Sequence, residues 1–293
     1  MTASDTHLAN CETHTWTGSG VGRVNEDYAL FDERLGCAVL VDGATGLTKA
    51  NIVPGTSDAA WYARTLSERL LVHLADPKTT MTDAFVAAGR EAAEAFRTIP
   101  GAEKLARIDE PNGSVVALRW QGDQVQVGLL GDCTAVVTMR DAAAVELHDA
   151  TLTLLDDQNY ERMYRYATER GTTMAEARKA LNPRFIENRL KMNEPDGYWA
   201  ADVSCRGMAH VLCHEFSSSE VVGLFACSDG YAAAVDMGVV GSAAELARRV
   251  ALGEGEAVGD ELRAAEELDA GCWRVHRSKT SDDATYVHVS LAR

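Results

Sequence analysis

The sequence predicts an α+β fold, a layered sandwich built on antiparallel sheets. Strand-like segments come in hairpin groups, and amphipathic helical segments come in consecutive pairs. A doubly wound α/β fold would instead alternate single strands with single helices along the chain. We find no internal repeat and no low-complexity linker. The 293 residues are therefore expected to form one domain over 11–293, preceded by a flexible tail over 1–10.

The first half predicts a hairpin followed by two helices. Residues 13–17 alternate as in a strand, and strand-like runs 28–31 and 37–41 flank the polar turn 32–34. Apolar residues then recur at steps of three and four over 59–74, after the possible N-caps Thr56 and Ser57, and again over 85–99, after Thr82. Each helix has a single apolar stripe, so we expect both to lie against a sheet.

The second half returns to strands, which the sequence places at 113–120, 124–130, 134–139 and 145–148. A charged helical segment over 156–194 follows and ends in a turn-rich run, so we expect an inserted helical flap over about 156–200. Further strands are expected at 210–215, 221–227, 273–277 and 285–291, with helices near 243–252 and 260–268.

The charge balance argues against two classes of partner. Lys and Arg total 28 and Asp and Glu total 44, which gives a net charge of −16. Nucleic acids and anionic membranes are polyanions and would be repelled, whereas an anionic substrate is compatible if a metal supplies positive charge. No apolar run approaches the roughly 20 residues of a membrane span. Seven cysteines without a CxxC pair favour free thiols and a cytoplasmic location.

Acidic motifs stand at the ends of four predicted strands. They are Asn25-Glu26-Asp27, Asp42-Gly43, Ser228-Asp229-Gly230 and Asp282-Asp283. Carboxylates at the ends of neighbouring strands can converge on one point, and Mg²⁺ and Mn²⁺ prefer such oxygen-only ligands. A single Asp-Gly is usually only a turn. Four acidic motifs in these positions together predict a divalent-metal site.

Six blocks of sequence carry a resemblance to a known family. They are GVGRVNEDY (20–28), VLVDGATG (39–46), NGSVVAL (112–118), LLGDCTAVV (129–137), LFACSDGY (224–231) and SDDATYVHV (281–289). In this order they make the chain similar to the PPM-type, or type 2C, metal-dependent protein phosphatases, as a divergent, bacterial-like member. The resemblance implies a four-layer α/β/β/α sandwich of two antiparallel sheets flanked by antiparallel helix pairs.

The resemblance also implies a set of site residues. Asp42 matches the acid that bridges two metals, and Gly43 matches the residue that offers its carbonyl. The other implied metal ligands are Glu26, Asp229 and Asp282, together with Asp132 for a weaker third ion. Asp27 matches the acid that holds metal-bound water. With two Mg²⁺ or Mn²⁺ ions, this set implies hydrolysis of a phosphate monoester by an activated water, without a covalent intermediate.

The sequence departs from the family pattern at three places. Arg23 stands three residues before Glu26, where the family usually has its phosphate-binding arginine four before. Ala44 stands where many members have a histidine near the leaving group, so the leaving-group proton must come from water or another group, unless good leaving groups are preferred. The flap replaces the usual segment. Its Arg189 and Lys191 are candidates to bind a distal anion of the substrate, with a solvated helix face as the alternative.

The resemblance makes a phosphoserine or phosphothreonine protein the default substrate. The absent histidine and the unusual flap motivate an alternative, a small-molecule phosphatase of a biosynthetic pathway that acts on a phosphorylated metabolite. A third hypothesis is a regulatory binding module that has lost catalysis. The complete set of acids argues against it, because a decayed site would be expected to lack at least one ligand.

Overall fold

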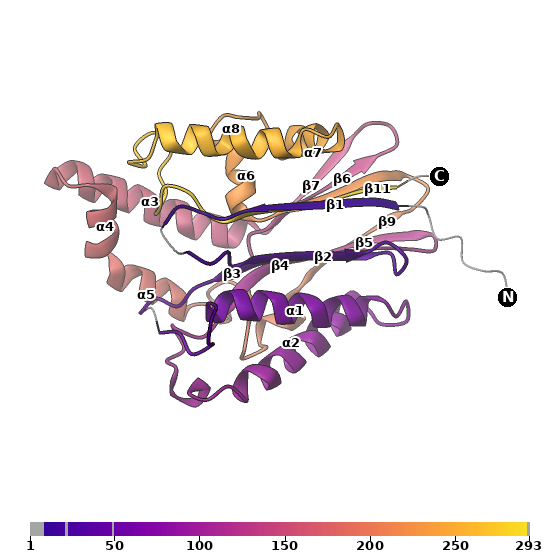
Figure 1. Cartoon of the computed structure of the whole chain (residues 1–293), viewed down its shortest axis with the longest axis horizontal. Coiled ribbons are helices and arrows are strands. Elements are labelled where there is room, and N and C mark those ends of the chain that lie inside the picture. The colour runs from indigo at the N-terminus through magenta and orange to yellow at the C-terminus, as the bar shows by residue number, and fades with distance from the viewer. Residues whose placement is uncertain (1–8, 21–22, 49, 292–293) are drawn as a thin grey trace.

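Two stacked antiparallel sheets form the centre of the molecule, which a computed structural model describes over residues 9–20, 23–48 and 50–291 (Figure 1). The first sheet has the order β1-β11-β10-β6-β7, and the second has the order β2-β3-β4-β5-β9 with β8 beside β4. The first comprises β1 (Ala9–Trp16), β11 (Ala284–Leu291), β10 (Val221–Cys227), β6 (Thr134–Met139) and β7 (Ala144–Leu147). The second comprises β2 (Asp27–Asp32), β3 (Cys37–Ala44), β4 (Asn112–Gln121), β5 (Gln124–Leu130), β9 (Leu212–Ser217) and β8 (Ala201–Asp202).

Helices cover the outer face of each sheet and confirm the expected four layers (Figure 1). Helices α1 (Asp58–Leu74) and α2 (Met81–Arg97) lie on the second sheet. Helices α6 (Asp229–Asp236), α7 (Ala243–Ala251) and α8 (Gly255–Leu268) lie on the first. None of the described helices combines the length and the apolarity needed to cross a bilayer. Each of the seven cysteines is free.

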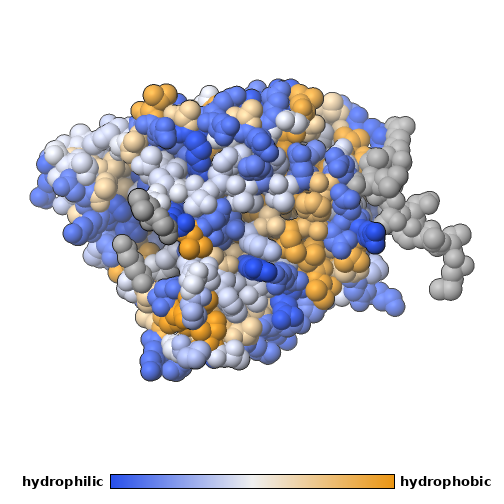
Figure 2. Space-filling view, in the orientation of Figure 1, coloured by the Kyte–Doolittle hydropathy of each residue, from blue (hydrophilic) through white to orange (hydrophobic). Residues whose placement is uncertain are grey.

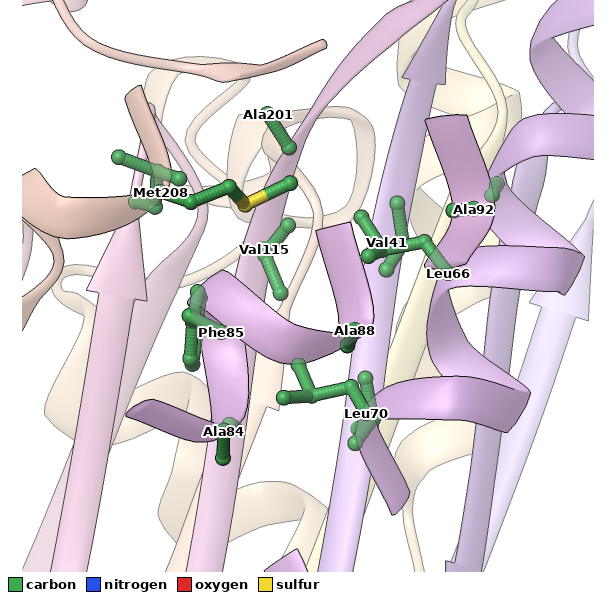
Figure 3. Close-up of a cluster of buried hydrophobic side chains, with 14 of the residues drawn as sticks. Val41, Leu66, Leu70, Ala84, Phe85, Ala88, Ala92, Val115, Ala201 and Met208 are labelled. Atoms are coloured by element: carbon green, nitrogen blue, oxygen red, sulfur yellow. The ribbon is translucent and has the colours of Figure 1, made fainter. Parts of the chain in front are cut away.

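Three hydrophobic layers hold the sandwich together. In β3, Leu40 faces the other sheet while Val39 and Val41 face α1 and α2, because successive side chains of a strand point to opposite sides. The strand is buried on both faces, which explains its continuous apolar sequence. Figure 3 shows the helix-facing layer, where Leu66 and Phe85 pack over the sheet.

The flap consists of α3 (Ala150–Arg170), α4 (Met174–Ala180) and α5 (Asn182–Leu190), at one end of the sandwich (Figure 1). It has a small core of its own, in which Met163, Ala167 and Met174 pack with Cys272. The face of the flap that is visible in Figure 2 is largely hydrophilic. The expected flap insertion is therefore present, and its first helix begins at Ala150, six residues before the predicted start.

The structure corrects several predicted boundaries. Helix α2 is capped by Thr80, whose side chain accepts the amide of Asp83, and not by Thr82. Helix α8 begins earlier than expected, and α6 was not predicted. Ala9 and Asn10 are paired in β1, within the tail expected over 1–10; residues 1–8 lie outside the described part of the chain.

Residues 273–277 do not form the predicted strand. The backbone amides of Trp273, Arg274 and Val275 donate to the carboxylate of Asp269, at 2.9, 3.0 and 3.1 Å, instead of to a neighbouring strand. Burial alone would raise the pKa of Asp269, but the amides and the Arg277 guanidinium lower it to about 2. The carboxylate therefore stays charged and provides the acceptors that a sheet would otherwise supply.

Gly259 is a site where α8 approaches β1 too closely for a side chain. A Cβ there would lie 2.2 Å from the Trp16 ring. We expect Gly259→Ala to destabilise the protein by about 1–3 kcal/mol, because overpacking outweighs the better helix propensity of alanine. Urea unfolding measures the effect. Glu267→Ala, at an exposed position of the same helix, should stay within about 0.5 kcal/mol of the parent; equal effects of both changes would contradict the prediction.

Candidate active site and metal centre

The predicted acids converge in a cleft between the strand ends and the flap. The cleft has a volume of about 530 Å³. Its core side is lined by Arg23, Glu26, Asp42, Asp132, Asp229 and Asp282. Its flap side is lined by residues that include Asp156, Tyr160, Arg178, Phe185 and Arg189. The acidic motifs, which lie up to 256 positions apart, thus meet at one place, as their strand-end positions predicted.

Strand register fixes the centre of this cluster. Asp27 of β2 lies opposite Asp42 of β3, and Asp42 lies opposite Ser114 of β4. A side chain on Gly43 would place its Cβ 2.6 Å from the carbonyl oxygen of Glu26, to which the Gly43 amide donates at 3.1 Å. Only glycine fits this approach, so the Asp-Gly pair serves packing in addition to any metal contact.

Asp132 joins the cluster from the turn after β5. Ligand atoms of Asp42, Asp132 and Cys133 all lie within 4.8 Å of one another. The Ser114 hydroxyl donates to Asp132 at 2.5 Å, and the backbone amide of Asp132 donates back to that hydroxyl at 3.1 Å. Burial and the nearby Asp42 raise the pKa of the Cys133 thiol, so this side chain stays protonated and is a poor metal ligand beside the carboxylates.

The crowded carboxylates lack positive charge at the centre of the cluster. Burial, followed by the neighbouring acids, raises the pKa of Asp42. Burial also raises the pKa of Asp27 to about 7 despite a hydrogen bond from Ser228, and it raises the pKa of Asp229 to about 7 beside Asp282 and Asp132. A divalent cation bound by oxygen ligands would relieve this repulsion, so the donor set fits Mg²⁺ or Mn²⁺.

Asp282 is the exception, since its pKa is lowered. Burial would raise it, but Lys279 and Arg23 overcome that effect. Arg23 Nη2 donates to Asp282 Oδ1 at 2.9 Å, Lys279 donates to the same oxygen, and the Asp283 amide does so at 2.8 Å. All three bonds use Oδ1. The other oxygen takes part in none of them and fits the role of metal ligand.

Glu26 and Asp283 connect the N-terminal loop to the strand ends. Thr45 donates its hydroxyl to both carboxylate oxygens of Glu26. Asp283 accepts the backbone amides of Gly18 at 2.7 Å and Glu26 at 2.9 Å, and the guanidinium of Arg23 at 3.2 Å. The second acid of the Asp282-Asp283 pair therefore orders this loop. Residues 21 and 22, in the sequence block 20–28, lie outside the part of the chain that the structure describes.

The arginine and lysine candidates differ in whether they line the cleft. Arg23 lines the cleft despite its shifted spacing, and Arg189 lines it from α5. Lys191 is exposed and is not among the residues that line the cleft. Asp27 is buried behind Asp42, where Ser228 donates to it at 2.8 Å. Gly43 lines the cleft beside Asp42.

Sequence analysis did not identify Asp156, Thr45 or Lys279 as residues of the site. Burial, followed by Asp229, raises the pKa of Asp156 to about 6, which places this helix α3 residue beside the cluster. Thr45 follows the Asp-Gly motif directly and Lys279 precedes Asp282 by three residues, so proximity to the motifs was a usable signal for both. The flap has no strand register, and nothing in its sequence indicated which of its acids faces inward.

The raised carboxyl pKa values predict how stability depends on pH. Asp27 and Asp229 bind protons more tightly in the folded chain, so stability falls as pH rises from about 4 to about 7. In EDTA we expect a lower Tm at about pH 8 than at about pH 5.5, and Mn²⁺ should raise Tm more at the higher pH. Differential scanning fluorimetry measures both effects.

Asp229→Asn provides the matched variant. It removes one of the repelling charges and one metal ligand, so in EDTA it should raise Tm at about pH 8 and weaken the response to Mn²⁺. An increase in the Tm of the unaltered protein across this pH range in EDTA would contradict the assignment of the cluster.

Comparison with solved structures finds the same fold in several phosphatases. The serine/threonine phosphatase PstP/Ppp of Mycobacterium tuberculosis matches with a TM-score of 0.57 and 14% identity, over 97% of this chain and 99% of that chain. Stp1 of Staphylococcus aureus, also a serine/threonine phosphatase, matches with a TM-score of 0.53 and 13% identity, over 100% and 99%. A PstP catalytic domain in complex with two manganese ions matches with a TM-score of 0.51 and 14% identity, over 98% and 100%.

Neither a family model nor a curated protein sequence matches the chain. The likeness therefore rests on three-dimensional structure, and it extends over nearly the full length of both chains. It agrees with the order of the six sequence blocks and with the two helix-covered sheets. This chain has the α/β/β/α fold of bacterial serine/threonine phosphatases, the PPM-type fold that its motifs resemble.

Proposed function

We propose that the chain is a divalent-metal-dependent hydrolase of phosphate monoesters that acts on phosphoserine and phosphothreonine in proteins. The main support is the convergence of Asp42, Asp229 and Asp282 in one cleft together with the cationic Arg23. Acids alone would repel a phosphate, whereas acids that hold cations beside an arginine create a site for it. The fold, and the two manganese ions in a structural neighbour, agree with this proposal.

The proposal assigns each residue a task. Asp42, Glu26, Asp229 and Asp282, with the Gly43 carbonyl, would hold the cations. Asp132 would contribute to a weaker third site. The bound pair supplies charge to offset the phosphoryl oxygens and makes water a better nucleophile. Asp27, paired with Asp42 on the neighbouring strand, would hold a water bound to the metals.

Arg23 would bind the phosphoryl group and remain fixed while it does so. Its Nη2 is already held by Asp282 and Asp283, at 2.9 and 3.2 Å, which limits the motion of the guanidinium. A preorganised donor stabilises developing charge without reorganising during the reaction. Lys279 adds a second positive charge at the same acid.

No comparison favours the metabolite alternative over a protein substrate. The binding-module alternative is disfavoured because five of the six predicted acids line the cleft with Arg23 and Gly43. The sixth, Asp27, is buried and pairs with Asp42 on the neighbouring strand. The proposal therefore retains the phosphoprotein substrate that the resemblance implied.

Metal removal tests the proposal directly. EDTA should abolish hydrolysis of p-nitrophenyl phosphate, and Mn²⁺ or Mg²⁺ should restore it. Asp42→Ala should lower kcat by about 100-fold or more, because it removes a ligand of both cations. Asp260→Ala, at an exposed acid of α8, should behave like the unaltered protein. Full activity in EDTA would refute the metal dependence.

Ala44 predicts a strong dependence on the leaving group. Because no histidine stands there to donate a proton, aryl phosphates, which leave as stable phenolates, should react faster than alkyl phosphates. Ala44→His should raise kcat for alkyl phosphates more than for aryl phosphates, with both proteins saturated in Mn²⁺. Leaving groups that span several pKa units measure this dependence. A flat series for the unaltered protein would show that another group donates the proton or that chemistry does not limit the rate.

A further inference from the structure

Two arginines of the flap line the cleft opposite the acid cluster. Arg178 belongs to α4 and Arg189 belongs to α5, and both side chains border the same volume as Asp42 and Asp229. These helices lie at the end of the sandwich, across the ends of both sheets (Figure 1). The cleft thus has a metal-binding wall of carboxylates and a facing wall that carries guanidinium groups.

Arg189 has an unsatisfied hydrogen-bond donor. Its Nη1 is buried and has no hydrogen-bond partner among the described residues. A guanidinium has five N–H donors, and a buried donor without an acceptor is unfavourable. Such a group at the wall of a cleft is typical of a site where a ligand supplies the missing acceptor.

Arg178 is held rigidly nearby. Its Nη1 donates to Asn182 Oδ1 at 3.0 Å, and its guanidinium carbon lies 3.5 Å from the centre of the Phe185 ring. Burial lowers the pKa of Arg178, and the positive charge of Arg189 lowers it further. Asp156, in the same cleft, offsets part of the positive charge of both arginines. The free Nη1 donor of Arg189 remains, and an anion bound there would stabilise both guanidinium groups further.

The same wall can accommodate a peptide. Tyr160, Phe185 and Tyr198 present aromatic rings to the cleft, and Asn188 presents a side-chain amide. Rings of this kind provide apolar contact area, and an amide can both donate to and accept from a peptide backbone. These groups line the cleft together with the two arginines, so a peptide bound there would contact the flap as well as the site of the reacting phosphate.

We propose that Arg178 and Arg189 form a second anion site, which selects phosphopeptides with an acidic side chain or a second phosphate close to the residue to be dephosphorylated. This inference rests on the proposed phosphatase function. It assigns substrate selection to two inward-facing residues of the flap. The outward-facing Arg184 is exposed and pairs with Glu187, and Lys191 is exposed outside the cleft; neither belongs to this site.

A pair of phosphothreonine peptides tests the site, identical except that one has glutamate and the other glutamine beside the phosphorylated residue. With the full chain in Mn²⁺, we expect kcat/KM to be about 10-fold higher for the glutamate peptide, the scale of one charge-assisted hydrogen bond. Arg189→Gln should bring this ratio close to one. Arg189→Lys should retain part of the preference, and Arg184→Gln should retain all of it.

Arg178→Gln should also lower the ratio, but the loss of its contact with Phe185 can disturb the flap. Thermal melting of each variant shows whether its fold is disturbed. If Arg178→Gln disturbs the fold, the peptide preference of Arg189→Gln alone tests the inference. A preference that survives Arg189→Gln in a folded protein overturns the inference. So does an unaltered protein that treats both peptides equally while it hydrolyses p-nitrophenyl phosphate in Mn²⁺.

Further substrates distinguish an anion on a peptide from an anion on a small molecule. They also distinguish failure of the anion site from failure of the proposed phosphatase function. If free phosphoserine is preferred over phosphoethanolamine through Arg189, and the peptides show no preference, the carboxylate belongs to a small molecule and the peptide assignment is wrong. If p-nitrophenyl phosphate and both peptides are inert in Mn²⁺, the proposed function fails. The anion site is then tested by binding alone: a fluorescent glutamate peptide should bind more tightly than its glutamine partner, and equal binding overturns the inference.

Discussion

The mutual repulsion of carboxylates is the constraint on which this structure depends. Backbone pairing holds Asp27 opposite Asp42, and the turn after β5 brings Asp132 to the same place. A shift of the backbone cannot separate these carboxylates, because β2, β3 and β5 belong to a sheet that is buried on both faces. The stability of the hydrophobic layers therefore maintains an electrostatically unfavourable cluster. The unrelieved negative charge of this cluster is the feature that would allow the site to hold cations.

Positive charge is distributed unequally around the cluster. Arg23 and Lys279 neutralise Asp282 at its outer side, whereas burial and neighbouring acids raise the pKa values of Asp27, Asp42 and Asp229. The protein thus neutralises the charge of Asp282 with positive side chains and leaves the central carboxylates without such partners. A site that paired all of its carboxylates with arginine and lysine would be more stable and would bind no metal. The incomplete compensation indicates where cations fit.

The flap gives the opposite wall a different chemical character. The core wall presents oxygen atoms, and the flap presents aromatic rings, amides and two arginines. The hydrophobic contacts of the flap are within itself, with Cys272 and with Met192, Tyr198 and Ala200. These clusters are separate from the three layers of the sandwich. Its inner surface can therefore change in sequence without disturbing the strand ends. In the proposed function, this separation would assign the chemistry to the strand ends and the selectivity to the flap.

Local patterns in the sequence indicate most of the strands and helices and the acids at the strand ends, because strand alternation, helical periodicity and strand-end motifs are local signals. The arrangement of the strands in two stacked sheets was implied by the family resemblance. The sequence located Glu26, Asp42, Asp229 and Asp282 before any contact was known. It could not foresee that Asp269 replaces a strand partner for residues 273–277, or that Asp156 and Arg178 face inward. Those facts depend on which side of a helix or turn meets a distant segment. The inward-facing side of a flap helix is known only from the folded chain, because the helices of the flap have no backbone register with the sheets that they face.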